Sequence, residues 1–169
     1  MGCGQMEKKS ENSVYVSMMA DSLKKKEDIL ELLYEKTVEQ ETILKAEEPD
    51  IEQFQQTIDR KGIWITQLDQ LDQGFDTLFK MVEKEIQANR ESYREEILEM
   101  QGRIRRVSDL SMKIQVLEHQ NSDRLQGYLS KKRSGIREAR VSSRTASSYY
   151  QNMANVHRSG QSYYLNETK

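Results

Sequence analysis

Residues 51–86 read IEQFQQTIDRKGIWITQLDQLDQGFDTLFKMVEKEI. Apolar residues recur there at alternating steps of three and four, the spacing by which one face of an α-helix packs against a partner helix. Two polar residues, Lys61 and Asp72, interrupt the series. The pattern predicts a helix over residues 50–88 with a coiled-coil-like seam, meaning the line of side chains along which helices pack. The apolar members of the series are Ile51, Phe54, Ile58, Ile65, Leu68, Phe75, Phe79, Val82 and Ile86.

A second helix is predicted before this stretch, over residues 13–47. Its end is marked by Pro49, the one proline, which disfavours helical backbone at Glu48 and is followed by acidic residues suited to a helix start. We therefore expect a turn at residues 47–50. Residues 1–12 are polar and carry no period, which predicts disorder. The expected seam is Val16, Met19, Leu23, Leu30, Leu33, Val38, Ile43 and Leu44.

The periodic pattern also continues beyond residue 88, which leaves two alternatives. A helix unbroken from Ile51 to Leu117 would be about 100 Å long, with only the first helix to cover it. A turn near Asn89 would let three helices cover one another, and Asn89 followed by Glu91 suits a helix start. We expect the turn and a third helix over residues 91–140. Its seam is Tyr93, Ile97, Met100, Ile104, Val107, Ile114 and Leu117.

The seam weakens after Leu117. Asn121 takes a seam position, and Gly127 and Gly135 interrupt the partial stripe that follows. Glycine costs a helix about 1 kcal/mol relative to alanine. A third helix of this length would extend past the other two, so its end is predicted to be an incomplete interface. Residues 141–169 are polar and are expected to form a flexible tail.

The composition supports an all-α protein. Charged residues make up 32% of the 169 residues, and only three Phe and one Trp are available to fill a core. Such a chain suits long amphipathic helices around a thin core. We expect a long antiparallel helical hairpin or three-helix bundle over residues 13–140, with a flexible C-terminal arm. Trp64 is expected to pack at the edge of the seam.

Charge is distributed unevenly along the chain. Residues 27–59 hold eleven acidic and two basic residues, whereas residues 124–144 hold seven basic and one acidic. The basic stretch raises the alternative of a nucleic-acid-binding arm. The formal net charge of −2 and the acidic region oppose that alternative, so no nucleic-acid partner is expected.

No active site is evident. His119 and His157 have no second ligand at metal spacing, and no phosphate-binding glycine loop follows a strand. We expect no enzymatic activity, no metal and no cofactor. Cys3 is the single cysteine and no apolar run is long enough to span a membrane, which favours a cytoplasmic protein. The start Met-Gly-Cys-Gly is similar to a lipidation signal, but Met6 stands where that pattern needs Ser or Thr.

Three stretches resemble the FlgN family of flagellar export chaperones in its clostridial form. They are IDRKGIWITQLDQLDQGF at residues 58–75, IRRVSDLSMKIQVLEHQN at residues 104–121 and VSSRTASSYY at residues 141–150. The resemblance extends over about residues 28–150, while the first dozen residues and the far C-terminus depart from it. The order of the three stretches along the chain carries the resemblance.

The resemblance implies a helical cytosolic chaperone. It would bind hook–filament junction proteins through its C-terminal part and deliver them to the flagellar type III export gate. The expected alternative is a structural coiled-coil scaffold without a client, for which self-association would be diagnostic. On this resemblance the expected partner-binding residues are Leu125, Tyr128, Leu129, Ile136, Val141, Tyr149 and Tyr150.

Overall fold

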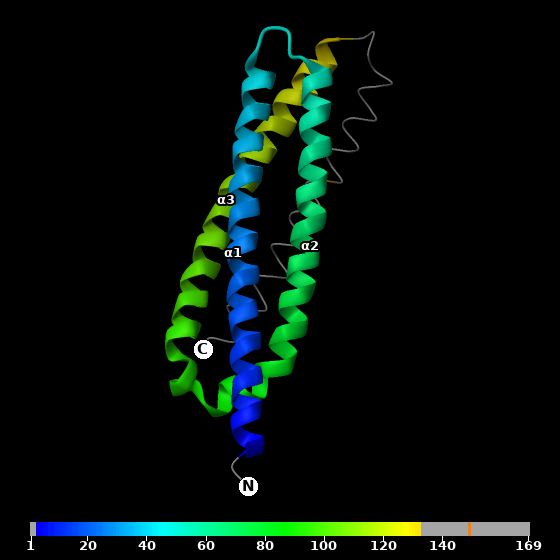
Figure 1. The fold of residues 1–169 in the computed structure, drawn as a ribbon. Coiled ribbons are helices and arrows are strands. Elements are labelled where there is room, and N and C mark those ends of the chain that lie inside the picture. The colour runs from blue at the N-terminus through cyan, green and yellow to red at the C-terminus, as the bar shows by residue number, and fades with distance from the viewer. Residues whose placement is uncertain (1–2, 133–148, 150–169) are drawn as a thin grey trace.

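The chain forms a bundle of three long α-helices in a computed structural model (Figure 1). The structure describes residues 3–132 and residue 149, and the side chains among them from residue 11 onward. Helix α1 spans Cys3–Lys45, α2 spans Ile51–Ala88 and α3 spans Arg94–Lys131, with a short 3-10 helix, η1, at Arg90–Tyr93. The described residues contain no strand, so the all-α prediction is confirmed.

Both predicted turns are present. Between α1 and α2, Asp50 caps the N-terminus of α2, because its side chain accepts a hydrogen bond of 3.1 Å from the Gln53 backbone N–H. Between α2 and α3, Asn89 ends α2 and η1 carries the chain around. The turn near Asn89 was the expected alternative, and it is confirmed.

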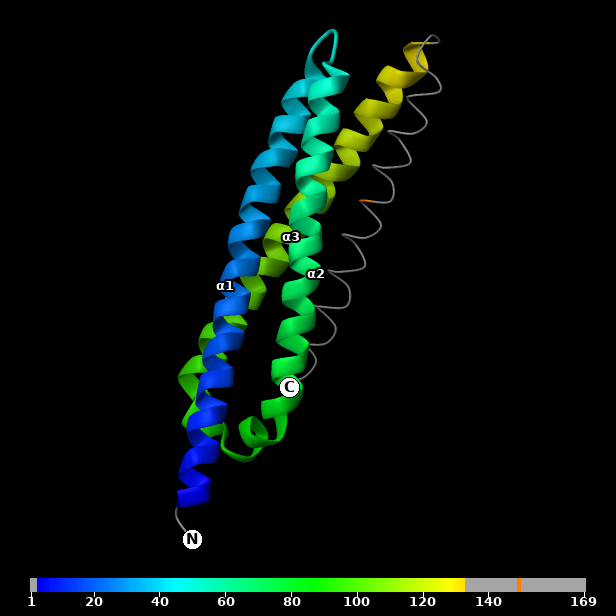
Figure 2. The same ribbon diagram turned by 45° about the vertical axis from the view of Figure 1, so that its right-hand side comes forward.

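The two turns lie at opposite ends of the bundle, so α1 and α3 run in the same direction and α2 runs against both (Figures 1 and 2). Helix α1 is central: it lies against α2 and against α3, whereas α2 and α3 stand farther apart and meet through side chains. Helix α3 is inclined to the other two in both views.

The parallel arrangement of α1 and α3 brings opposite charges together. Glu27 of α1 pairs with Arg103 and Arg106 of α3, at 2.8 and 3.3 Å, and Glu41 pairs with Arg124 at 3.3 Å. Some of the acidic residues of the N-terminal half are therefore neutralised by arginines of α3. These are partly exposed pairs, each worth at most about 1 kcal/mol.

The core consists of three successive clusters along the bundle axis. The cluster nearest the α2–α3 turn contains Val16, Met19, Leu23, Phe75, Val82, Tyr93 and Met100. The central cluster contains Leu30, Leu33, Leu68, Val107, Ile114 and Tyr149. The cluster nearest the α1–α2 turn contains Ile43, Leu44, Phe54, Ile58 and Leu125. The predicted seam of residues 51–86 is thus the side of α2 that faces the core.

The helix bounds correct three expectations. Helix α1 begins at Cys3, so residues 3–12 belong to a helix and were wrongly expected to be disordered. Helix α3 ends at Lys131, nine residues before the expected end at residue 140, and Lys132 has extended backbone. The end of α3 is partly covered, because Leu125 packs into the cluster nearest the α1–α2 turn and Leu129 lies half-buried against it.

Two predicted seam positions also move by one residue. In α1 the buried residue is Thr37, and the apolar Val38 is 37% exposed. In α3 the buried residue is Glu118, while Leu117 is only half-buried. At both places the polar side chain faces the core, because polar groups on the neighbouring helices bind it there.

Candidate functional site

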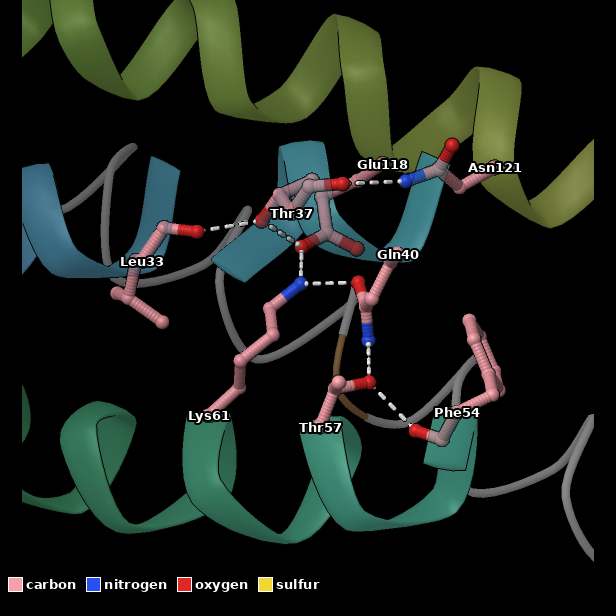
Figure 3. A network of polar contacts seen from close by, with 8 residues as sticks. All are labelled: Leu33, Thr37, Gln40, Phe54, Thr57, Lys61, Glu118 and Asn121. Carbon is pink, nitrogen blue, oxygen red and sulfur yellow. Dashed lines mark hydrogen bonds and ion pairs between the residues drawn. The ribbon is translucent and has the colours of Figure 1, made fainter. Parts of the chain in front are cut away.

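A layer of buried polar residues crosses the bundle between its central cluster and the cluster nearest the α1–α2 turn (Figure 3). At its centre, Lys61 of α2 and Glu118 of α3 form an ion pair through Lys61 Nζ and Glu118 Oε1, with 1% and 3% of their side chains exposed. An ion pair so deeply buried is uncommon, since each charge loses its hydration on folding.

The central helix α1 contributes hydrogen-bonding groups to both members of the pair. Lys61 Nζ donates to Gln40 Oε1 at 2.8 Å, and Gln40 Nε2 in turn donates to Thr57 Oγ1 at 2.9 Å. The Thr37 hydroxyl lies 3.1 Å from Glu118 Oε1 and 2.6 Å from the Leu33 carbonyl, either of which can accept its single proton. All three helices are therefore joined at this layer.

Asn121 of α3 extends the layer by one turn. Its side-chain amide donates to the Thr37 backbone carbonyl at 3.0 Å, and its Oδ1 accepts from Arg124 at 3.0 Å. Asn121 is fully buried. A single buried asparagine in a coiled-coil seam is a well-attested means of fixing helix register, and this one was expected only to weaken the seam.

Burial also shifts the acid–base behaviour of the pair. Desolvation lowers the pKa of Lys61 to about 8, against the opposing attraction and hydrogen bond of Glu118. Desolvation raises the pKa of Glu118, against the charge of Lys61 and hydrogen bonds from Lys61, Thr37 and Tyr149. Both groups thus favour their neutral forms more than they would in water, although each supplies the other's counter-charge.

Tyr149 completes the site from a distant part of the sequence. The centroid of its ring lies 4.4 Å from Lys61 Nζ, which is cation–π geometry, and its hydroxyl oxygen is buried. The residue is 9% exposed and belongs to the central cluster, to which Trp64 and Leu110 add half-buried side chains. A flexible tail over residues 141–169 was therefore wrong for Tyr149, and the rest of that range lies outside the described residues.

A second seam ion pair lies one cluster away. Lys26 Nζ of α1 is 2.7 Å from Asp72 Oδ1 of α2, with 7% and 24% of their side chains exposed. Burial raises the pKa of Asp72, and the Lys26 charge opposes that shift. Lys61 and Asp72, the two interruptions of the α2 seam, are thus each joined to a residue of opposite charge on a neighbouring helix.

The structure places the predicted partner-binding residues differently from one another. Leu125 is a core residue, so the expectation that it forms an open interface is corrected, and Leu129 is half-buried against the same cluster. Tyr128 is half-buried, and its ring lies 5.2 Å from the Lys132 ammonium. Tyr149 is seated in the core. Ile136, Val141 and Tyr150 lie outside the described residues.

Several residues singled out in the sequence lie at the surface or edge of the bundle. His119 has an 81% exposed side chain, with Nε2 3.6 Å from an Asp123 oxygen, as expected for a solvated residue. Trp64 is half-buried and packs against the central cluster, which confirms its expected place at the edge of the seam. Within residues 3–132 and 149, no group of three acidic, histidine or cysteine side chains could hold a metal ion, and no helix has a stretch apolar enough to cross a membrane.

The polar layer offers little access for chemistry on a substrate. A lysine with a lowered pKa is a common nucleophile or base. Here the amine is fully buried, donates to Glu118 and Gln40, and is covered by the Tyr149 ring. The arrangement is suited to holding helices in register and to seating an aromatic side chain.

Sequence reasoning missed Thr37, Gln40 and Glu118, although a signal for them exists. Thr37 and Gln40 follow the core residues Leu30 and Leu33 by seven, and Glu118 follows Ser111 by seven. Counting heptads through the polar residues would have found the layer. Comparison of the chain with protein-family models, with curated proteins and with solved structures gave no match.

Proposed function

We propose that this chain is a non-catalytic cytoplasmic chaperone of flagellar type III export. In this proposal it holds hook–filament junction proteins through the C-terminal part of the chain and presents them to the export gate. The proposal rests on the three stretches that resemble the FlgN family, and one observation about their position in the fold gives it its strongest support.

That observation is that described residues of all three stretches lie at one place. Residues 58–75 contribute Lys61 and Leu68, residues 104–121 contribute Ile114 and Glu118, and Tyr149 is the described residue of the third stretch. These residues, far apart in the sequence, share the central cluster and the polar layer. A chance likeness in periodic helices would not require Tyr149 to pack against residues of the other two stretches.

The arrangement suits a protein that binds helices reversibly. Helices α2 and α3 meet only through side chains, and the space beside them admits an aromatic residue from beyond α3. Apolar helical segments of an export client can use such a surface. Ordering part of the chaperone on binding lowers the affinity, which favours release at the gate.

A truncation tests the proposal. The natural end point is Lys132, since Leu125 is a core residue, Leu129 packs against the same cluster, and a shorter chain would lose part of the bundle. We expect the chain ending at Lys132 to keep its helical circular dichroism and to lose co-purification with junction proteins. A chain ending at His157, which keeps all the predicted binding residues, is the matched control. Retention of the junction protein by the shorter chain would reject the assignment.

A structural scaffold is the second candidate, favoured by an exposed apolar stripe on α3. Leu98, Met112 and Val116 are 56–60% exposed and fall at spacings of fourteen and four, so they share one face. A scaffold would use this face to self-associate. Sedimentation of the full chain over a range of concentrations separates the two functions, because a chaperone that stays monomeric excludes a self-assembling scaffold.

A further inference from the structure

Tyr149 is held by a buried charge pair as well as by apolar contact. Its ring centroid lies 4.4 Å from Lys61 Nζ, and its hydroxyl oxygen is buried within the central cluster. Glu118 is the ion-pair partner of Lys61, and both side chains are almost fully buried. The seat is therefore built from α2 and α3 together, at the level where α1 joins them.

The chemistry of the seat favours an aromatic residue. A buried ammonium attracts the face of an aromatic ring, and the Tyr149 ring lies over Lys61 Nζ. An aliphatic side chain would offer no such attraction. Since the ion pair itself is costly to bury, a ring that interacts with the ammonium stabilises the seated arrangement.

We propose that Tyr149 is an intramolecular latch, meaning that its side chain, while seated on the Lys61–Glu118 pair, is withheld from a partner that would bind it. Seated, Tyr149 is unavailable to a partner, and the apparent affinity for the partner falls by the fraction of molecules in which it is released. The identity of the partner rests on the proposed function, whereas the seating of Tyr149 on the ion pair is independent of that function.

The chain contains a matched control for this proposal. Lys61–Glu118 and Lys26–Asp72 are both interhelix ion pairs at seam positions, and the Tyr149 ring lies over Lys61 of the first pair. The double variants Lys61→Met with Glu118→Gln, and Lys26→Met with Asp72→Asn, each replace one pair by neutral residues of similar volume. Such replacements are often tolerated by the fold.

Nitration of tyrosine in the full-length chain measures the latch directly. With site-resolved mass spectrometry, Tyr149 should react more slowly than the exposed Tyr34 in the unaltered protein. The Lys61→Met/Glu118→Gln variant should raise the Tyr149 rate about tenfold, which corresponds to about 1.4 kcal/mol. The Lys26→Met/Asp72→Asn variant should leave that rate unchanged. An unaltered Tyr149 rate in the first variant, or an equal rise in both, would overturn the latch.

Titration with a junction protein then tests the coupling of the latch to binding. The Lys61→Met/Glu118→Gln variant should bind more tightly than the unaltered chain by a factor similar to its rise in nitration rate, and the control variant should bind as the unaltered chain does. Equal affinity in all three would overturn the coupling. If none of the three binds a junction protein, the proposed function is rejected, and the nitration comparison alone decides the latch.

Discussion

Lys61 of α2 and Glu118 of α3 are 57 residues apart in the sequence and form an ion pair with both side chains buried. Each side chain neutralises the charge of the other, which offsets the free-energy cost of burying that charge away from water. We expect Lys61→Met alone or Glu118→Gln alone to lower the free energy of unfolding by about 3 kcal/mol, because one charge is then left buried without its partner.

The corresponding double variant should recover most of that loss. Urea unfolding of the four proteins gives the coupling energy, which should be of the order of 2 kcal/mol or more. Single effects that simply add would show that the two groups do not depend on each other, and would contradict the pairing.

The lowered pKa of Lys61 predicts a pH dependence with a definite sign. Its pKa is about 8 in the folded chain and 10.5 as the ordinary value, so between these pH values the unfolded chain binds more protons than the folded one. Stability contributed by this group therefore rises with pH in that window, by up to about 1.4 kcal/mol per pH unit. Thermal unfolding at pH 7 and pH 9.5 measures the effect.

The Lys61→Met/Glu118→Gln variant isolates this contribution from the other groups that titrate at high pH. The free energy of unfolding of the unaltered chain should rise relative to that of the variant between pH 7 and pH 9.5. A difference between the two proteins that stays constant over this range would contradict a lowered pKa for Lys61.

The fold could be predicted largely because the apolar residues of α2 recur at regular helical spacing. Its apolar positions and its two interruptions, Lys61 and Asp72, all lie in the phase that the structure shows. Pro49 and the acidic residues that follow it then located the first turn, and Asn89 with the acidic residues after it located the second, although the Asn89 side chain makes no capping hydrogen bond. Periodicity, caps and proline act locally, so one sequence is enough to place them.

The polar layer could not be predicted in the same way. Thr37 and Val38, like Leu117 and Glu118, are neighbours about 100° apart around a helix, and hydrophobicity favours the apolar member of each pair. The structure buries the polar members because they have partners on other helices: Glu118 pairs with Lys61 of α2, and the Thr37 hydroxyl of α1 lies against Glu118 of α3. Which helix supplies a hydrogen-bonding partner depends on the tertiary structure and not on the local sequence. The packing of Tyr149 in the core depends on the tertiary structure in the same way, since the sequence around it has no apolar period.

Gly127 lies inside α3, where it was expected to interrupt a partial apolar stripe. An added Cβ there would meet nothing within 4 Å, and its backbone has no positive φ. Gly127→Ala should therefore raise the free energy of unfolding by about 0.5–1 kcal/mol. Gly74→Ala in α2, which is equally open, is the parallel variant. Loss of stability in either would mean that the helix needs glycine at that position.

Substitution of Leu125 distinguishes a core role from a partner-binding role for the residues at the end of α3. It is 2% exposed among Ile43, Leu44, Phe54 and Ile58. Leu125→Ala should cost about 2–5 kcal/mol of stability, as truncations of buried leucine do. Tyr128→Ala, one turn along the same helix at a half-buried position, should cost no more than about 1 kcal/mol.

Unfolding and partner capture must be measured on the same two variants. If Leu125 serves the core, its variant loses a junction protein only under conditions in which the bundle is itself unfolded, and captures it under conditions in which circular dichroism shows the bundle folded. A direct contact would behave otherwise: the Leu125→Ala chain would fail to capture the junction protein even while folded, and the same would then be expected of the folded Tyr128→Ala chain.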